Sequence, residues 1–153
     1  MRVAIIGAHG QLGSDATQVF RENGDEVSAL GHADIEVSSI DSVAAALRQL
    51  KPEMIVNTAA MHHVERCEQD PKLAFAINAL GPRNLGMVAH DLHARFMHIS
   101  TDYVFDGGKK SPYVEGDSPA PLNTYGITKL AGEFYARRTV DRHFVLRTSG
   151  LYG

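Results

Sequence analysis

The sequence lacks the features that mark secreted, membrane-bound or nucleic-acid-binding proteins. Its 153 residues include one cysteine, Cys67, which rules out an internal disulfide framework and is typical of a reducing cytoplasm. The amino-terminal segment MRVAIIGAHG lacks the basic region and the longer apolar stretch of a signal peptide. No basic run or long apolar segment is present, and the formal net charge is only −3. We therefore expect a cytoplasmic protein with no nucleic-acid partner and no membrane partner.

Internal repeats and low-complexity segments are also absent. With 153 residues, of which 44% are hydrophobic, the chain can form one domain with a core but not two typical domains. Strand-like apolar runs alternate with helical patterns, which predicts an α/β fold with a doubly wound parallel sheet of the Rossmann type. The predicted strands cover residues 3–6, 27–30, 54–59, 96–100 and 144–147, and the predicted helices cover 13–23, 39–50, 71–79, 82–92 and a segment from 124 onward.

A glycine-rich segment, GAHGQLG, follows the first predicted strand and leads into the first helix. Glycines at such a turn let backbone N–H groups approach a pyrophosphate, which then lies at the positive end of the helix. The spacing is G-x-x-G-x-x-G rather than the commoner G-x-G-x-x-G. The alternative is a turn that binds nothing, but its position between a strand and a helix favours a dinucleotide.

The end of the second strand usually selects between NAD and NADP. A carboxylate there binds the ribose hydroxyls, and a basic side chain accepts the 2′-phosphate. This strand ends Leu30-Gly31-His32, with neither, and Asp34 and Glu36 follow where the adenine edge is expected. The cofactor is therefore NADP(H) or NAD(H), with a slight preference for NADP(H).

A tyrosine and a lysine one helical turn apart form the pattern Y-x-x-x-K in TYGITKLAG. At about 100° per residue, Tyr125 and Lys129 share a face with Gly132 and Ala136, which would leave room for a ligand. A nearby ammonium is expected to lower the pKa of the phenol, which is about 10 in isolation. The opposite face is predicted to be the buried stripe: Ile127, Leu130, Ala131 and Phe134.

Hydroxyl groups follow the fourth predicted strand in HISTDYVF, and a stretch rich in Gly, Pro, Ser and Asp covers residues 102–123. Ligands of open α/β sheets bind beyond the carboxyl ends of the strands, and loops of this length are usually functional or disordered. These hydroxyls and the Tyr125–Lys129 pair are therefore expected at one site.

These segments resemble the extended short-chain dehydrogenases/reductases and, within them, the dTDP-4-dehydrorhamnose reductases. The resemblance covers the whole chain, as the amino-terminal portion of such an enzyme. Its most specific part is the combination of STDYVF with PLxxYGxxKLAGE. The segments that carry it are GAHGQLG, VNTAA (56–60), STDYVFDG (100–107), PLNTYGITKLAGE (121–133) and RTSGLYG (147–153).

The resemblance implies a catalytic triad of Thr101, Tyr125 and Lys129. Hydride would pass from the nicotinamide to C4 of a 4-keto-6-deoxy sugar on a nucleoside diphosphate. Tyr125 would protonate the oxyanion, Thr101 would hold the carbonyl, and Lys129 would bind the nicotinamide ribose and tune Tyr125. Asp102 and Tyr103 would lie beside the substrate with Thr101. The implied cofactor-binding residues are Gly7, Gly10, Gln11, Leu12 and Gly13 around the pyrophosphate, Glu36 and Val37 at the adenosine end, Ala59, Ala60 and Met61 after the third strand, and Tyr125 and Lys129.

Two departures from the family pattern leave the identity of the sugar open. Many members read approximately Y-T-x-V-D-x-A-E where this chain reads MHHVERCE (61–68), and some have a substrate-contacting tryptophan where Gly150 stands. The cluster His62, His63, Cys67 and Glu68 lacks zinc-site spacing, and adjacent histidines usually point apart, so no metal site is predicted.

Family members continue beyond RTSGLYG into further strands and a smaller substrate-binding region. We therefore expect this chain alone to be inactive, and the complete protein to form a homodimer. Two other functions are considered: another sugar-nucleotide epimerase or dehydratase of the family, and a non-catalytic dinucleotide-binding regulatory subunit. The intact triad argues against the regulatory subunit.

Overall fold

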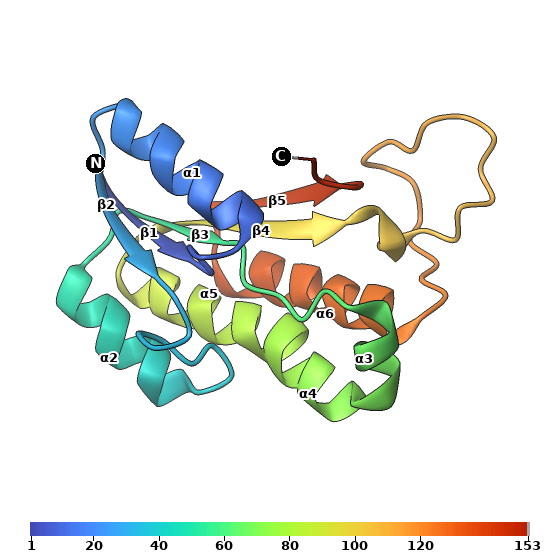
Figure 1. Cartoon of the computed structure of the whole chain (residues 1–153), viewed down its shortest axis with the longest axis horizontal. Helices are drawn as coiled ribbons and strands as arrows, with labels where there is room; N and C mark the ends of the chain where they lie inside the picture. Colours follow the sequence, from blue (N-terminus) through green and yellow to red (C-terminus); the bar gives the residue numbers. More distant parts are fainter. Residues whose placement is uncertain (153) are drawn as a thin grey trace.

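A five-stranded parallel sheet crosses the computed structural model, which describes residues 1–152 (Figure 1). The strand order is β2-β1-β3-β4-β5, so β2 and β5 form the two edges. All five predicted strands are present. They are β1 (Arg2–Ile6), β2 (Glu26–Leu30), β3 (Met54–Asn57), β4 (Arg95–Thr101) and β5 (His143–Thr148).

Helices cover both faces of the sheet but not equally. Figure 1 shows α1 on one face and the other helices on the opposite face. The helices are α1 (Gln11–Glu22), α2 (Ile40–Leu50), α3 (Val64–Gln69), α4 (Pro71–Phe75), the π-helical turn η1 (Ala76–Leu80), α5 (Gly81–Asp91), the 3₁₀ turn η2 (Asp102–Val104) and α6 (Thr124–Thr139). In the described part of the chain, none of them is long and apolar enough to cross a membrane.

The core is divided by the sheet into two layers. The larger layer packs the sheet against the helices opposite α1 and includes Leu47, Leu85 and Phe96, all at 0% exposure. The smaller layer lies beneath α1 and includes Ile5 and Val56. Because both faces of β1 and β3 are covered, these strands read as continuous apolar runs, which is typical of parallel sheets.

Several predicted boundaries need correction. The third strand ends at Asn57 rather than at residue 59, because the chain turns there and both the N–H and the hydroxyl of Thr58 bond the Ile6 carbonyl. The first helix begins at Gln11, two residues before the predicted start at residue 13. It ends before Gly24 (φ 81°), as predicted. The helix α3 was not predicted, and the helix predicted over residues 71–79 is divided into α4 and the π-turn η1. Gly153, the last residue of the RTSGLYG segment, lies outside the described residues.

The prediction for the faces of α6 is wrong. Ile127 is 44% exposed and Phe134 is 59% exposed, although both were assigned to a buried stripe. The buried face instead carries Lys129, Gly132 and Ala136. A Cβ on Gly132 would lie 2.3 Å from the Asn78 carbonyl oxygen. The small residues therefore allow α6 to pack closely on η1, and they do not leave room for a ligand.

Candidate functional site

The glycine turn (residues 7–13) is shaped by two glycines that the fold requires. Gly7 has φ +80°, and a Cβ there would lie 2.8 Å from the backbone nitrogen of Ala59. A Cβ on Gly13 would lie 2.2 Å from the Gly7 carbonyl oxygen. These close approaches pack the turn against the chain that leaves β3, so the ends of β1 and β3 form one surface.

Gly10 differs from these two glycines, because no close contact of the fold requires it. It is exposed, and the nearest atom to a Cβ there would be the Gly7 carbonyl oxygen at 3.4 Å. Gly10 is also the N-cap of α1, which has no acidic residue in its first turn. The N–H groups of Gln11, Leu12 and Gly13 have no acceptor within the helix. An open helix end without a side chain at Gly10 suits an anion, and it fits the pyrophosphate of a dinucleotide.

Two buried asparagines hold the segment after β3 that was predicted to contact the cofactor. Asn57 Oδ1 accepts a hydrogen bond from Ala59 N at 3.1 Å. Asn78 Oδ1 accepts from Met61 N at 2.8 Å, while its amide nitrogen donates to Met61 O at 3.0 Å and to Thr128 Oγ1 at 3.1 Å. Neither asparagine was predicted from the sequence as a residue of the site. A polar residue ending the buried run MIVN could have revealed Asn57, whereas Asn78 depends on the π-turn.

The residues predicted for the adenosine end mostly bind within their own turn. Glu36 accepts hydrogen bonds from the N–H and the hydroxyl of Ser38 at 3.0 and 2.8 Å, and these bonds lower the pKa of its carboxyl. The Val37 side chain is buried, and its carbonyl accepts from Asn84 Nδ2 at 3.0 Å. Asp34 Oδ2 accepts from Gly31 N at 2.8 Å. The contacts of Glu36 and Val37 with adenosine stay predictions.

Close packing of α6 on η2 brings the predicted catalytic hydroxyls together. Thr101 is the last residue of β4, and Asn123 caps the first turn of α6 by accepting from Gly126 N at 2.8 Å. A Cβ on Gly126 would lie 2.2 Å from the Tyr103 carbonyl oxygen. The rings of Tyr103 and Tyr125 meet edge to face with centroids 5.5 Å apart. The structure therefore places Thr101, Tyr103 and Tyr125 next to one another, and their roles in a site stay predictions.

Tyr125 does not have the lowered pKa that was expected from a neighbouring ammonium. Burial raises the pKa of the phenol above its ordinary value, and the Thr101 hydroxyl offsets only part of this effect. The Lys129 ammonium instead donates to the Ile99 carbonyl oxygen of β4 at 2.6 Å. The lysine therefore binds the strand and is not seen to lower the pKa of the tyrosine.

Lys129 is a buried cation, at 3% exposure. Burial lowers its pKa to about 8, and the charge of Glu133 limits the decrease. His98 of β4 lies near the ammonium and is itself fully buried, so its pKa lies well below the ordinary value. The site thus combines one charged lysine with one neutral histidine in an interior of low dielectric.

The segment 61–68, which departs from the family pattern, is bound to its surroundings. The rings of His62 and His63 do not point apart as expected, since their centroids are 4.2 Å apart. Cys67 Sγ donates to the Met61 carbonyl at 3.3 Å. The two carboxylate oxygens of Glu68 accept from Thr124 N at 2.6 Å and from its hydroxyl at 2.7 Å. Glu68 therefore holds the first turn of α6, and among residues 1–152 no three metal-ligating side chains gather.

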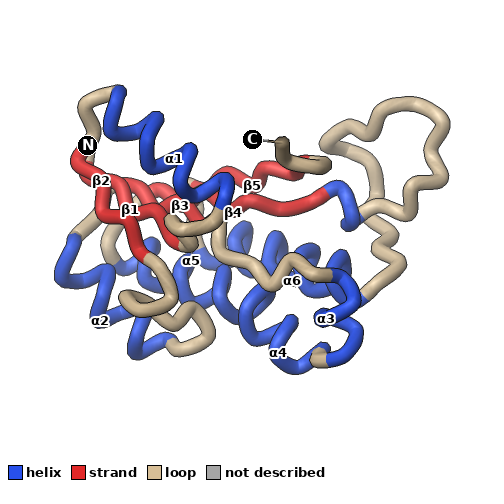
Figure 2. The backbone as a smooth tube through the Cα atoms, viewed as in Figure 1, coloured by secondary structure: helices blue, strands red, loops and turns tan. Residues whose placement is uncertain are grey.

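The loop between η2 and α6 projects beyond the carboxyl ends of β4 and β5 (Figure 2). Asp117 bonds the Lys109 ammonium at 2.5 Å, and the Tyr113 ring stacks on Phe105 with centroids 4.0 Å apart. The loop therefore has internal contacts of its own next to the Thr101–Tyr125 site.

Comparison with known proteins gives a consistent result. A dTDP-4-dehydrorhamnose reductase of Sinorhizobium fredii is 38% identical over 152 residues, covering 99% of this chain and 51% of the relative. The crystal structure of a dTDP-4-dehydrorhamnose reductase from Clostridium acetobutylicum has a TM-score of 0.97 at 37% identity, covering 100% of this chain and 55% of that one. The Bacillus anthracis enzyme in complex with NADP has a TM-score of 0.96 at 35% identity, covering 99% and 54%.

The chain spans about half the length of these relatives. The family described as RmlD substrate binding domain matches residues 1–153. Because that match extends over the whole sequence, the chain belongs to the RmlD substrate binding domain family.

Proposed function

We propose that this chain is the cofactor-binding and catalytic part of an NAD(P)H-dependent reductase that acts on nucleotide-linked 4-keto-6-deoxy sugars. The reaction is reduction of the C4 ketone, with dTDP-4-dehydro-L-rhamnose as substrate and dTDP-L-rhamnose as product. One observation carries the proposal: at the carboxyl end of β4, Thr101 hydrogen-bonds Tyr125 of α6, and Lys129, one turn further along α6, binds the Ile99 carbonyl of the same strand. The names of the relatives support the choice of substrate.

The side chains of the triad have distinct tasks in this proposal. The bound reduced nicotinamide supplies the hydride. Tyr125 stays protonated at neutral pH because burial raises its pKa, so its phenol can donate a proton to the carbonyl oxygen as negative charge develops there. Thr101, whose hydroxyl donates to Asp102 Oδ1 at 3.2 Å, would turn to donate to the same oxygen. Solvent then restores the tyrosine proton.

Lys129 acts as a donor of hydrogen bonds to the cofactor. An ammonium has three N–H donors, and one of them binds the Ile99 carbonyl. The other two suit the hydroxyls of the nicotinamide ribose. Gln11, Leu12 and Gly13 would bind the pyrophosphate through their backbone N–H groups at the start of α1.

NADP(H) is the favoured cofactor. The carboxylate of Asp34, which lies closest to the end of β2 in sequence, binds the Gly31 N–H, so no free carboxylate follows Leu30 directly. The NADP complex of the Bacillus anthracis relative supports the same choice. Competitive titration of NADPH and NADH tests this, and a clear preference for NADH would reject it.

The proposal is tested with the natural protein that carries this chain, supplied with dTDP-4-dehydro-L-rhamnose and NADPH. We expect loss of NADPH absorbance in proportion to the dTDP-L-rhamnose formed. Tight NADPH binding without any ketone reduction would reject the reductase. A cytoplasmic location and a homodimer of the complete protein stay predictions, and light scattering tests the dimer.

A further inference from the structure

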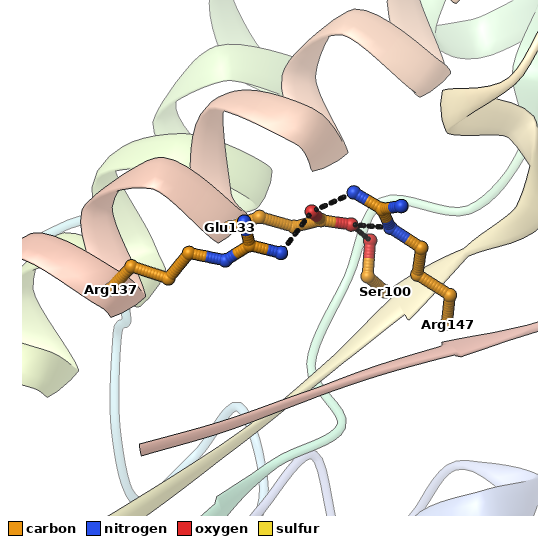
Figure 3. A network of polar contacts seen from close by, with 4 residues as sticks. All are labelled: Ser100, Glu133, Arg137 and Arg147. Atoms are coloured by element: carbon orange, nitrogen blue, oxygen red, sulfur yellow. Dashed lines mark hydrogen bonds and ion pairs between the residues drawn. The ribbon is translucent and has the colours of Figure 1, made fainter. Parts of the chain in front are cut away.

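A buried carboxylate lies on α6 one turn beyond Lys129. Glu133 is 1% exposed, and Figure 3 shows its carboxylate between the guanidinium groups of Arg137 and Arg147. It accepts four hydrogen bonds: from Ser100 Oγ at 2.7 Å, from Arg147 Nε at 2.8 Å, from Arg147 Nη2 at 2.6 Å and from Arg137 Nη2 at 3.3 Å.

Stability alone does not account for the ion pair between Glu133 and Arg147. Replacing a buried ion pair by well-packed apolar residues is often neutral or stabilising, because removing two charges from water is costly. Burial of this carboxylate is therefore weak evidence for a role in stability. The buried carboxylate needs another reason.

The position of Glu133 suggests that reason. Ser100 directly precedes Thr101 on β4, and Arg147 is its partner on β5 in the register of the two strands. The helix that carries Glu133 also carries Tyr125 and Lys129. The carboxylate thus binds the catalytic helix to the strand ends beside Thr101.

The charge of Glu133 also matters for Lys129. Burial lowers the pKa of Lys129 to about 8, and Glu133 is the group whose charge raises it. Other titratable or charged groups come from each element around this part of α6. They are Tyr125 and Arg137 of α6, neutral His98 of β4, Arg147 of β5, and Cys67 of α3 with Asp102 and Tyr103 of η2 on the Tyr125 side.

We propose that Glu133 is a positioning residue that fixes α6 on the ends of β4 and β5 and places a negative charge one helical turn from Lys129. It touches neither substrate nor cofactor and acts through Lys129. This inference rests on the proposed function, since it gives Lys129 its role toward the dinucleotide.

The test follows NADPH binding against pH in the natural protein that carries this chain. In the wild type, affinity should begin to fall near pH 8, where Lys129 loses its proton. We call the pH at which affinity begins to fall the break. In Glu133→Gln the break should be lower by about one pH unit, since an opposite charge nearby shifts a pKa by roughly 1–3 units. Arg137→Gln, which removes a half-exposed partner of the same carboxylate, is the control and should keep the wild-type break.

A second variant separates charge from folding. Glu133→Leu with Arg147→Leu replaces the ion pair by an apolar pair and should fold, yet its break should move as far as that of Glu133→Gln. A wild-type break in both variants would overturn the proposal. Loss of the fold in the apolar variant, together with a wild-type pH profile in Glu133→Gln, would also overturn it, by showing that the pair acts through stability alone.

A readout without cofactor keeps the two proposals distinguishable. The unfolded chain binds a proton at Lys129 that the folded chain has lost between pH 8 and 10.5, so the free energy of unfolding rises with pH in that window. The pH at which this rise begins, its onset, should be lower in Glu133→Gln. If the wild type binds no NADPH at any pH, the proposed function fails, and this onset alone decides the role of Glu133.

Discussion

The glycine turn and the Thr101–Tyr125–Lys129 cluster both lie at the carboxyl ends of the parallel strands, yet they are built in opposite ways. The turn is one continuous segment in which backbone and the lack of side chains do the work. The cluster brings together residues from β4 and α6 and depends on buried side chains and their charges. One site is defined by space and the other by electrostatics.

Because of this difference, substitutions at the two sites should act through different physical effects. A substitution in the glycine turn acts through atomic overlap, so its effect depends on which glycine is changed. A substitution in the cluster acts through desolvation and charge, so its effect depends on pH. Substitutions can therefore alter binding or chemistry at each site with little change, or even a gain, in stability.

The largest expected effect is on chemistry in the cluster. Tyr125→Phe in the natural protein should reduce turnover roughly 10²–10⁴-fold, the usual contribution of a general acid. NADPH affinity should stay nearly unchanged, because the backbone of the glycine turn is untouched. Steady-state kinetics and NADPH titration check both parts. Turnover close to that of the wild type would remove Tyr125 from the mechanism.

The second effect is a gain in stability from removing the buried cation. Burial lowers the pKa of Lys129 from 10.5 to about 8 in the folded chain. At 1.36 kcal/mol per pKa unit, keeping the lysine charged lowers the free energy of unfolding by about 3 kcal/mol at pH 7. Lys129→Met loses the bond to the Ile99 carbonyl, which reduces the net gain in unfolding free energy to about 2 kcal/mol. The same variant should lose activity.

Chemical denaturation at two pH values checks this interpretation. Above pH 10.5 the lysine is neutral in both the folded and the unfolded chain, so the gain should disappear. A variant that is less stable than the wild type at pH 7 would show that the ammonium does not carry the penalty.

The sequence predicted the glycine turn well because its signal is local. A buried strand, three glycines at fixed spacing and a helix lie within one short segment, and all of them are present in the structure. The five strands were also recognisable, and in β1 and β3 the signal is a continuous apolar run, which is typical of strands covered on both faces.

The cluster was predicted only in part, because its properties arise from tertiary packing. The apolar Ile127 and Phe134 are exposed, while Lys129 and Glu133 are buried, which reverses the assignment that hydrophobicity alone would make. The pKa of Tyr125 depends on burial, and the lysine binds a strand carbonyl instead. The π-turn that places Asn78 has no recognisable sequence pattern.

The third effect is a pH dependence that the cluster should have and the glycine turn should lack. His98 is fully buried, its Nε2 has no partner among the described residues, and its pKa is well below the ordinary value. Below about pH 6.5 the unfolded histidine binds a proton and the folded one does not, so stability falls with acid by about 1.4 kcal/mol per pH unit.

His98→Asn should remove this part of the acid slope, because an amide does not titrate. Its oxygen can still accept the hydrogen bond that Asn57 Nδ2 donates to His98 Nδ1 at 3.1 Å. Unfolding curves between pH 4 and 7 measure the slope, and the exposed His90→Gln serves as the control. Equal slopes in all three proteins would mean that His98 is protonated in the folded chain.

The smallest expected change in stability distinguishes two glycines of the same turn. Gly10 has φ −78° and ψ 167°, which alanine adopts readily, and a Cβ there would meet only the Gly7 carbonyl oxygen at 3.4 Å. Gly10→Ala should therefore change the free energy of unfolding by less than about 0.5 kcal/mol. Gly13→Ala, whose Cβ would lie 2.2 Å from the same oxygen, should lose about 1–3 kcal/mol.

Binding should respond in a different way from stability. A methyl group at Gly10 would stand at the proposed pyrophosphate site, so Gly10→Ala should weaken NADPH binding about tenfold, the value of one charge-assisted hydrogen bond. Thermal unfolding and NADPH titration of both variants give the comparison. If Gly10→Ala binds NADPH as the wild type does, the pyrophosphate does not lie against Gly10. The dinucleotide must then bind elsewhere along the carboxyl ends of the strands.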